Sequence, residues 1–244
     1  MIIWIGIDDT DNLDSRGTGF LARSLSEYLT KKNLGRCEWI SRHQLLVDPA
    51  IPYTSHNSSL CLKWLTTTEK IDLIIQESST FLAAQSATGS DPGLCIVTES
   101  ESDQSLIEFG YEAKRKVLTK EYALLLANSL PIHLSEHGGT GGGIIGALAG
   151  VGLSSSGNDG RFVWLKGIRE MKGIFSAYEI VKQSGVNRIQ SLDQNVIDSD
   201  DTIDIGEWFR PVLIGHQAVL LVEPSQSTAS KWKIIDRKTI KARY

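Results

Sequence analysis

The chain has 244 residues, of which 41% are hydrophobic and 22% charged, and its formal net charge is −4. This length allows one large domain or two modest ones, each with its own core. The negative charge excludes a global basic field of the kind that marks many nucleic-acid-binding and membrane-surface proteins, so any basic patch must be local.

The three cysteines, Cys37, Cys61 and Cys95, are too widely spaced for a zinc ribbon or a redox dithiol. No apolar run reaches the length of a membrane span, and the N-terminus has no basic region followed by a cleavage site. We therefore expect a cytoplasmic protein that does not interact with membranes.

Strands and helices alternate in the first half of the chain. Residues 2–7 form an apolar, β-branched run that predicts a buried strand. Leu21, Leu25 and Leu29 recur at helical spacing and predict a helix that ends near Gly35. Further strands are predicted over residues 37–47, 59–65 and 94–98, and a helix over residues 69–85.

The second half begins with a long, mostly helical stretch, residues 102–128, with a break near Gly110. A short strand is predicted at residues 132–134, and a glycine-rich stretch then leads into a helix over residues 144–149. The remaining elements are a loop at residues 154–160, a helix over 174–181, strands over 162–165, 212–214 and 218–222, and a basic tail at 231–243.

Three carboxylates, Asp8, Asp9 and Asp11, follow the first predicted strand within four residues. Crowded carboxylates repel one another unless a cation or hydrogen bonds neutralise them. Mg²⁺ prefers such oxygen ligands and usually shares them with substrate phosphates. From the spacing alone, a loop whose aspartates cap the next helix is almost as good an interpretation.

The glycine-rich stretch GGTGGG, residues 138–143, is the second candidate site. Backbone N–H groups of Gly141, Gly142 and Gly143 could converge on an anion at the start of the following helix. The stretch is neither a P-loop nor a Rossmann turn, and by itself a tight turn is the slightly better interpretation. Together with the carboxylates, however, it indicates the two halves of a nucleotide site.

Several other polar residues near these motifs have open roles. Thr18 could cap the following helix, accept a phosphoryl group or bind a metal, and Arg16 could clamp a phosphate. The sequence does not assign roles to His56, Glu136 and His137.

These motifs together resemble the tRNA-Ile agmatidine synthetase family. WIGIDDTD, residues 4–11, followed by Gly17 and the residues up to Ala22, is similar to the N-terminal kinase-like motif of that family. Residues 51–53 with Asn57 resemble its IPxxTRGNG stretch. GIIGALA, residues 143–149, is similar to its GxIGALAA turn, and residues 211–215 resemble a strand of its ferredoxin-like domain.

The resemblance implies an α/β (α+β) fold in which a mixed-sheet, kinase-like domain is interleaved with a ferredoxin-like domain. Residues 1–58 and 102–172 would form the kinase-like domain, and residues 59–101 and 173–244 the ferredoxin-like domain.

The resemblance also implies that the chain binds ATP and Mg²⁺. Asp8, Asp9 and Asp11 would hold the metal and the triphosphate. Thr18, an autophosphorylation site in the family, would act in catalysis with Asp8 and Asp9. The nucleotide-binding residues would be Thr10, Gly17, Asn57, Gly141, Gly142 and Gly143.

The resemblance does not extend to the OB-fold and zinc-ribbon parts of the family, and residues 55–58 replace its RGNG sequence. We therefore predict an ATP- and Mg²⁺-dependent phosphoryl-transfer or ligase-like enzyme whose acceptor is a small molecule. Two alternatives stay open: a non-catalytic nucleotide- or ligand-binding module, and a tRNA-modifying enzyme that needs a separate RNA-binding partner. Neither the acceptor nor the formation of a homo-oligomer follows from the residues.

Overall fold

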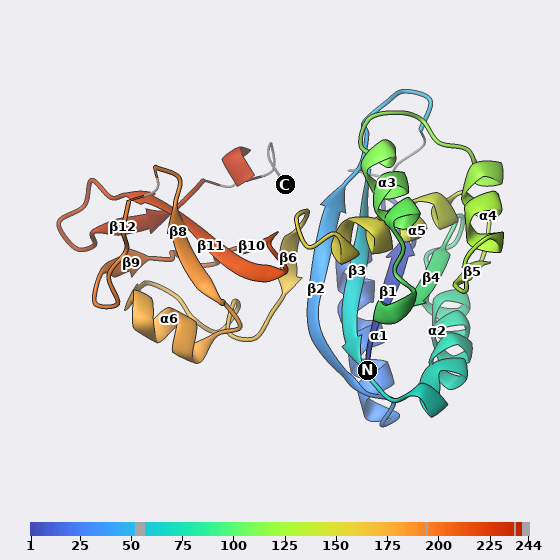
Figure 1. The fold of residues 1–244 in the computed structure, drawn as a ribbon, viewed down its shortest axis with the longest axis horizontal. Helices are drawn as coiled ribbons and strands as arrows, with labels where there is room; N and C mark the ends of the chain where they lie inside the picture. The colour runs from blue at the N-terminus through green and yellow to red at the C-terminus, as the bar shows by residue number, and fades with distance from the viewer. Residues whose placement is uncertain (52–56, 194, 237, 241–244) are drawn as a thin grey trace. The chain divides into compact units, whose positions relative to one another are not determined.

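A computed structural model of the chain describes residues 1–51, 57–193, 195–236 and 238–240. The chain forms two compact units, unit 1 (Met1–Ser156) and unit 2 (Gly157–Tyr244) (Figure 1). Helices occur beside both antiparallel and parallel strands, as expected for the predicted α+β class. Within the described ranges, no helix combines the length and apolar character needed to cross a membrane.

The described residues of unit 1 form five strands in the order β5-β4-β1-β3-β2, and each pair of neighbours is antiparallel. The central strand β1 (Ile2–Asp8) lies between β3 (Ser58–Leu65) and β4 (Gly93–Thr98). β2 (Arg36–Gln44) pairs with β3, and β5 (His133–Glu136) pairs with β4. The predicted strands in this part of the chain are therefore confirmed.

The first four strands combine with α1 (Thr18–Lys31) and α2 (Ile71–Gln85) in the order βαββαβ, which is the ferredoxin-like arrangement. This arrangement ends with β4 and lies wholly in unit 1. The structure thus differs from the predicted interleaved domains, 1–58 with 102–172 and 59–101 with 173–244. The reason is that β3 and β4 both pair with β1, which makes residues 59–101 part of the first unit.

Helices cover both faces of this sheet, which explains why β1 is apolar along its length (Figure 1). Successive side chains of a strand point to opposite faces, and Gly6 and Asp8 point toward α5 (Gly143–Ser155). Helix α1 contacts β1, β2 and β3, and α2 contacts β4. Helix α3 (Gln104–Ala113) packs on α5, and α4 (Lys120–Asn128) contacts α5 and β5. Two short 3-10 helices, η1 (Thr68–Lys70) and η2 (Glu99–Glu101), complete the unit.

Helix α5 is enclosed by the sheet and α3, and every residue in it except Ile145 is buried. A Cβ atom on Gly6 would overlap the carbonyl oxygen of Ala147, and one on Gly152 would overlap that of Leu106. Glycine at these two positions therefore lets the helix backbone approach its neighbours closely.

Several predicted helices have different boundaries in the structure. The helix predicted over 144–149 is α5, which continues to Ser155 and so enters the predicted loop at 154–160. The stretch 102–128 forms α3 and α4, and the chain breaks after Ala113 rather than near Gly110. Gly110 lies inside α3, where a Cβ would come within 2.9 Å of the Ala149 carbonyl oxygen. Residues 174–181 contain strand β7 (Ile174–Ser176) before α6 (Ala177–Gln183), because the Ser176 side chain caps that helix.

Unit 2 consists mainly of short strands. Strand β11 (Gln217–Pro224) pairs antiparallel with β10 (Val212–Ile214) and β12 (Trp232–Ile234), and parallel with β8 (Arg188–Ser191). The other strands are β6 (Arg161–Trp164) beside β10, β9 (Thr202–Asp204) parallel to β12, and β7 beside β9. Val212, Val219, Leu221, Ile235 and Ile240 form an apolar cluster, so the predicted basic tail contributes to the core.

We predict that Gly6→Ala destabilises the protein by about 3 kcal/mol, a fall in Tm of about 10 °C, because the added methyl group forces α5 away from β1. Thermal unfolding followed by circular dichroism measures this change. Gly89→Ala is the matched control, since Gly89 has a φ of +82° but open space around a Cβ. It should cost only about 1 kcal/mol through backbone strain. Equal losses in the two variants would contradict the steric explanation.

Candidate functional site

Strand ends gather at one edge of the unit 1 sheet. Asp8, at the end of β1, pairs with Gly93 at the start of β4, and Gly93 also pairs with Glu136 at the end of β5. On the other side, Gln44 at the end of β2 pairs with Ser58 at the start of β3. The antiparallel pairing thus brings loops from distant parts of the chain to the carboxylates that follow β1.

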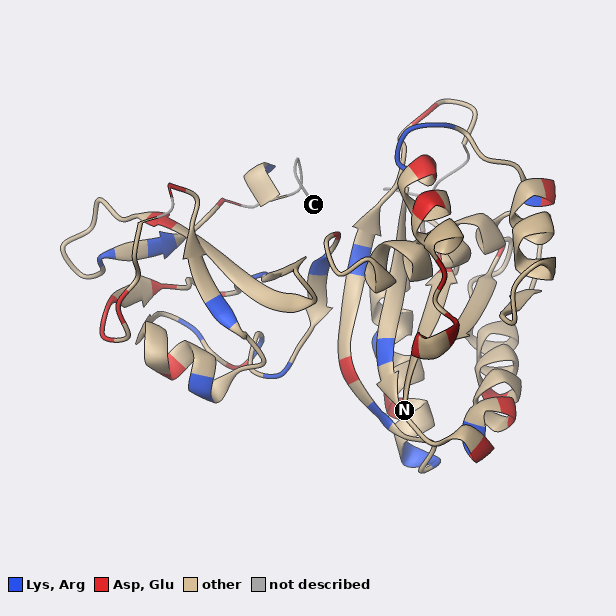
Figure 2. Cartoon of the chain, viewed as in Figure 1, with Lys and Arg blue, Asp and Glu red and all other residues tan. Residues whose placement is uncertain are grey.

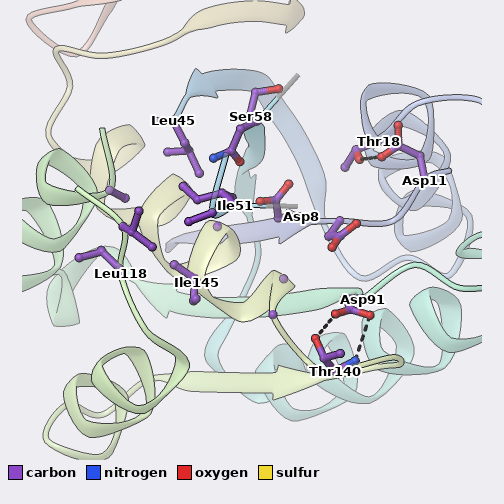
Figure 3. Close-up of a pocket in the computed structure, with 18 of the residues that line it drawn as sticks. Asp8, Asp11, Thr18, Leu45, Ile51, Ser58, Asp91, Leu118, Thr140 and Ile145 are labelled. Atoms are coloured by element: carbon purple, nitrogen blue, oxygen red, sulfur yellow. Dashed lines mark hydrogen bonds between the residues drawn. The ribbon is translucent and has the colours of Figure 1, made fainter. Parts of the chain in front are cut away.

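A cavity of about 330 Å³ opens at this edge (Figure 3). Its volume is within the range of small-molecule sites. The lining divides into a polar part near Asp8 and an apolar part near Ile145, and it lies wholly in unit 1. The polar part comprises Asp8, Asp9, Asp11, Gly17, Thr18, Arg42, Asn57, Ser58, Asp91, Lys116, Thr140, Gly142, Gly143 and Gly146, and the apolar part Leu45, Ala50, Ile51, Ala113, Val117, Leu118 and Ile145.

The carboxyl group of Asp8 lies against the first turn of α5. A Cβ atom on Gly146 would overlap this carboxyl group, so glycine is required for the helix to come so close. Burial raises the pKa of Asp8 to about 7, although a hydrogen bond from the Asp9 N–H opposes the shift. The charges of Asp9 and Asp11 raise the pKa further, whereas Arg42 lowers it.

Asp9 has a positive φ of 50°, a left-handed conformation that Asp adopts more readily than most residues. Burial raises the pKa of Asp9 to about 6, and the charges of Asp91 and Asp11 add to the effect, while a hydrogen bond from the Asp91 N–H lowers it. Both carboxyl groups therefore resist ionisation, and a divalent cation beside them would stabilise their charged forms.

Asp8, Asp9 and Asp11 line the same cavity, but they do not form a finished metal centre. In the described part of the chain, no three Asp, Glu, His or Cys side chains are grouped closely enough to hold a metal ion. The carboxylates suit Mg²⁺ as donors, since this ion commonly takes one or two protein carboxylates and completes its shell with water and phosphate oxygens.

Asp11 is linked to Thr18. The Thr18 hydroxyl donates a hydrogen bond of 2.9 Å to Asp11 Oδ1, and both residues line the cavity. The interpretation of Thr18 as a helix cap is wrong, because Gly17 is the N-cap of α1 and Thr18 is the first helical residue. Its hydroxyl instead faces the carboxylates.

The glycine-rich turn is held by Asp91, which comes just before β4. The Thr140 N–H donates to Asp91 Oδ1 at 3.0 Å, the Thr140 hydroxyl donates to Oδ2, and the Gly143 N–H donates to the Asp91 carbonyl oxygen at 3.1 Å. Burial acts to raise the pKa of Asp91. The hydrogen bonds from Thr140 and from the Gly142 N–H outweigh this effect, so the pKa is lowered. Of the N–H groups that were predicted to bind phosphate, that of Gly142 thus donates to the Asp91 carboxylate and that of Gly143 to the Asp91 carbonyl oxygen.

Three of the predicted nucleotide-binding residues either lie outside the cavity lining or have their polar group hydrogen-bonded within the protein. Gly141 does not line the cavity, and its N–H donates to the Gly138 carbonyl at 3.2 Å. Asn57 lines the cavity, but its side-chain amide donates to the Leu46 carbonyl at 2.6 Å. Thr10 is buried and does not line the cavity, and its hydroxyl finds no hydrogen-bond partner among the described residues.

Three of the residues with open roles, Arg16, Glu136 and His137, lie outside the cavity lining. Arg16 stacks on the Phe20 ring, with 3.9 Å between its Cζ and the ring centroid. Glu136 accepts a hydrogen bond of 2.7 Å from Lys120, and His137 Nε2 is 2.8 Å from the Ser135 hydroxyl. His56 falls outside the described residues.

Sequence reasoning missed several polar residues of the cavity, among them the charged residues Arg42 and Asp91. Arg42 on β2 donates a hydrogen bond of 3.1 Å to the Ser58 hydroxyl and provides a cation opposite Asp8. The sequence carried no clear signal for Arg42, because the predicted strand 37–47 also contains Glu38, His43 and Gln44. For Asp91, the only signal was its place in the loop before β4.

Solved structures of one enzyme are similar to this chain. A scan against protein-family models finds no match, and a search of curated proteins finds none either. Among solved structures, apo tRNAIle2 agmatidine synthetase (TiaS) is similar, with a TM-score of 0.55 and 26% identity over 62% of this chain and 35% of that one.

Two TiaS complexes are similar as well. The TiaS–tRNA(Ile2)–ATP complex has a TM-score of 0.55 and 28% identity, and the complex with tRNA(Ile2), AMPCPP and agmatine has 0.53 and 27%, each over 62% of this chain and 36% of that one. The part of this chain that is matched is comparable in length to unit 1. The chain spans little more than a third of the length of these structures. The chain is thus TiaS-like, which confirms the resemblance predicted from the motifs.

We predict that Asp8→Asn makes the metal-free protein more stable at pH 8 but not at pH 4. The folded wild type holds the Asp8 proton up to a pKa of about 7, whereas the unfolded chain releases it near the ordinary value of 3.8. Stability therefore falls as the pH rises through this window, and the variant should avoid a loss of up to about 4 kcal/mol.

Urea unfolding with a chelator present, measured from pH 4 to 8, tests this prediction. Asp14→Asn, which changes an exposed aspartate of the same loop, should keep the wild-type pH dependence. Parallel curves for wild type and Asp8→Asn would contradict the prediction.

Proposed function

We propose that unit 1 binds ATP with Mg²⁺ and uses it in a ligase-like modification of tRNA. The observation that carries this proposal is the cavity itself, in which desolvated carboxylates and an arginine face an apolar surface. Similarity to an enzyme whose structures contain ATP and tRNA supports it. This evidence favours the tRNA-modifying alternative over the small-molecule acceptor predicted first.

The polar part of the cavity is suited to a metal–triphosphate unit. Asp8 and Asp9 would hold Mg²⁺, which neutralises phosphate charge when bound. Arg42 would add a second positive charge on the opposite side. The apolar part, which includes Ile51, Leu118 and Ile145, offers a surface for a nucleobase (Figure 3).

Thr18 is the proposed nucleophile of this site. Its hydroxyl already donates to Asp11, so Asp11 can take the proton as the Thr18 oxygen bonds to the γ-phosphorus of ATP, while the bond from that phosphorus to the bridging oxygen breaks and ADP leaves. Asp11 would then act as a base, while Asp8 and Asp9 hold the metal. This division of roles differs from the predicted one, in which all three aspartates hold the metal.

Isothermal titration with ATP and Mg²⁺ tests the binding step. We expect Asp8→Ala and Asp9→Ala to weaken ATP binding at least about tenfold, because each removes a charge that would hold the metal. Asp14→Ala, in the same loop but outside the cavity lining, should bind like the wild type. No binding by the wild type would overturn the proposal.

ATP consumption with and without a tRNA transcript tests the reaction. We expect tRNA to stimulate ATP consumption by the wild type, and Thr18→Val to reduce this turnover at least about a hundredfold while ATP affinity changes little. Thr18→Ser, which keeps the hydroxyl, should retain turnover. Tight ATP binding without tRNA-dependent turnover would favour the alternative of a non-catalytic nucleotide-binding module.

A further inference from the structure

A hydrogen-bond network of two histidines and a serine lies at the edge strand of unit 1. In the described part of the chain, β5 is the outermost strand of its sheet and pairs with β4 at four positions. His133 Nε2 and His137 Nε2 are each 2.8 Å from the Ser135 hydroxyl oxygen. Side chains two residues apart in a strand point to the same face, and all three of these are half-buried. We call them the histidine–serine network, and none of them lines the cavity.

The protons of this network match neutral histidines. A serine hydroxyl donates one hydrogen bond and accepts through two lone pairs, whereas a neutral imidazole has one N–H and one acceptor nitrogen. Ser135 therefore donates to one ring and accepts the Nε2–H of the other. A single added proton still fits, because the protonated ring can be the one that donates. When both rings are protonated, neither accepts, so the hydroxyl proton loses its partner and two positive charges meet at one oxygen.

The surroundings of the rings also oppose protonation. Burial lowers the pKa of His133 below its ordinary value of 6.5. Burial lowers the pKa of His137 as well, and the charge of His133 adds to this effect. Within the described ranges, no carboxylate shifts the pKa of either ring in the opposite direction. Both histidines are therefore neutral at pH 7.

The elements around the network supply no counter-ion. On β4, Ile96 lies opposite His133 and Leu94 lies opposite Ser135. Helix α5 contains no charged residue and is tan along its length in Figure 2. Glu136 points to the other face of β5. The charged residues on the neighbouring segments are bound elsewhere or exposed, namely Lys120 and Glu136 with each other, Glu121 with Thr119, Asp91 with Thr140, Glu77 with Lys32, and the exposed Asp72.

The network adjoins the turn that lines the cavity. His137 is followed directly by the glycine-rich stretch, residues 138–143, and its N–H donates to the Pro92 carbonyl at 2.8 Å. Three residues of that stretch line the cavity, namely Thr140, Gly142 and Gly143. A short edge strand opens more readily than the strands inside a sheet, so side-chain bonds that hold it also hold the turn after it.

We propose that the histidine–serine network is an acid-sensitive clamp, which holds β5 and the glycine-rich turn closed at neutral pH and loosens them when both histidines are protonated. In the open form the rings are exposed and take up protons at the ordinary pKa of 6.5, whereas the closed form takes them up only at lower pH. The closed form is thus fully favoured above pH 6.5 and loses stability as the pH falls below it. The clamp is independent of the proposed function, and only its effect on ATP binding rests on that function.

Hydrogen exchange of the full chain at pH 7 and pH 5, corrected for the intrinsic exchange rate at each pH, tests the clamp. In the wild type, we expect the protection factors of the β5 amides to fall at least about tenfold relative to those of β1. In a variant with both His133→Gln and His137→Gln, this relative fall should disappear, because a glutamine amide does not titrate. Asp8 and Asp9 also titrate in this range, but the variant leaves them unchanged.

His216→Gln is the matched control, because it replaces an exposed histidine of unit 2 and should keep the wild-type fall. Ser135→Ala removes the hydroxyl but keeps both rings, and it should lower β5 protection already at pH 7. An equal fall in the wild type and the double variant, or no fall in the wild type, would overturn the inference. An NMR titration of the wild type needs no variant, and a pKa at or above 6.5 for both His133 and His137 would overturn it too.

Titration with ATP and Mg²⁺ at the same two pH values separates the clamp from the proposed function. A larger loss of ATP affinity at pH 5 in the wild type than in the double variant would extend the effect of the clamp to the cavity, and equal losses would confine it to β5. Clamp behaviour in hydrogen exchange without ATP binding at either pH would support the clamp and contradict the proposed function. ATP binding at pH 7 without a histidine-dependent fall in protection would do the reverse.

Discussion

The close approach of α5 to the central strand is the constraint on which the site depends. Gly6 and Gly146 remove the side-chain atoms that would otherwise separate β1 from the helix. The first turn of α5 therefore lies directly beside Asp8, and the helix and sheet together strip water from its carboxyl group. The same contact fixes where the cavity can be, since Ile145, the one α5 residue that is not buried, lines it.

The electrostatics of the cavity follow from this packing. Desolvation and crowding raise the pKa values of Asp8 and Asp9, so the folded chain bears an energetic cost that a bound cation would relieve. The pKa of Asp91 is lowered instead, because hydrogen bonds from Thr140 and Gly142 stabilise its charged form. The glycine-rich turn is thus already occupied by a carboxylate. A triphosphate would be held mainly by its metal and by Arg42 rather than by the turn.

Much of unit 1 could be predicted from local pattern. The apolar run 2–7, the helical spacing of Leu21, Leu25 and Leu29, and the carboxylates after β1 all identify elements or side chains that line the site. The domain boundaries could not be predicted in this way. The pairing of β3 and β4 with β1 joins residues far apart in sequence, and no local pattern records which strands become neighbours.

Residue type and short-range spacing are enough to predict that carboxylates follow a buried strand and that a glycine-rich turn opens a helix. What those groups contact depends on how distant elements pack together. This packing turned the N–H groups of the glycine-rich turn toward Asp91, linked Thr18 to Asp11, and brought Arg42 into the cavity. The physical reason is that desolvation, charge and hydrogen bonding at a site depend on distances in space, and strand pairing and helix packing set those distances.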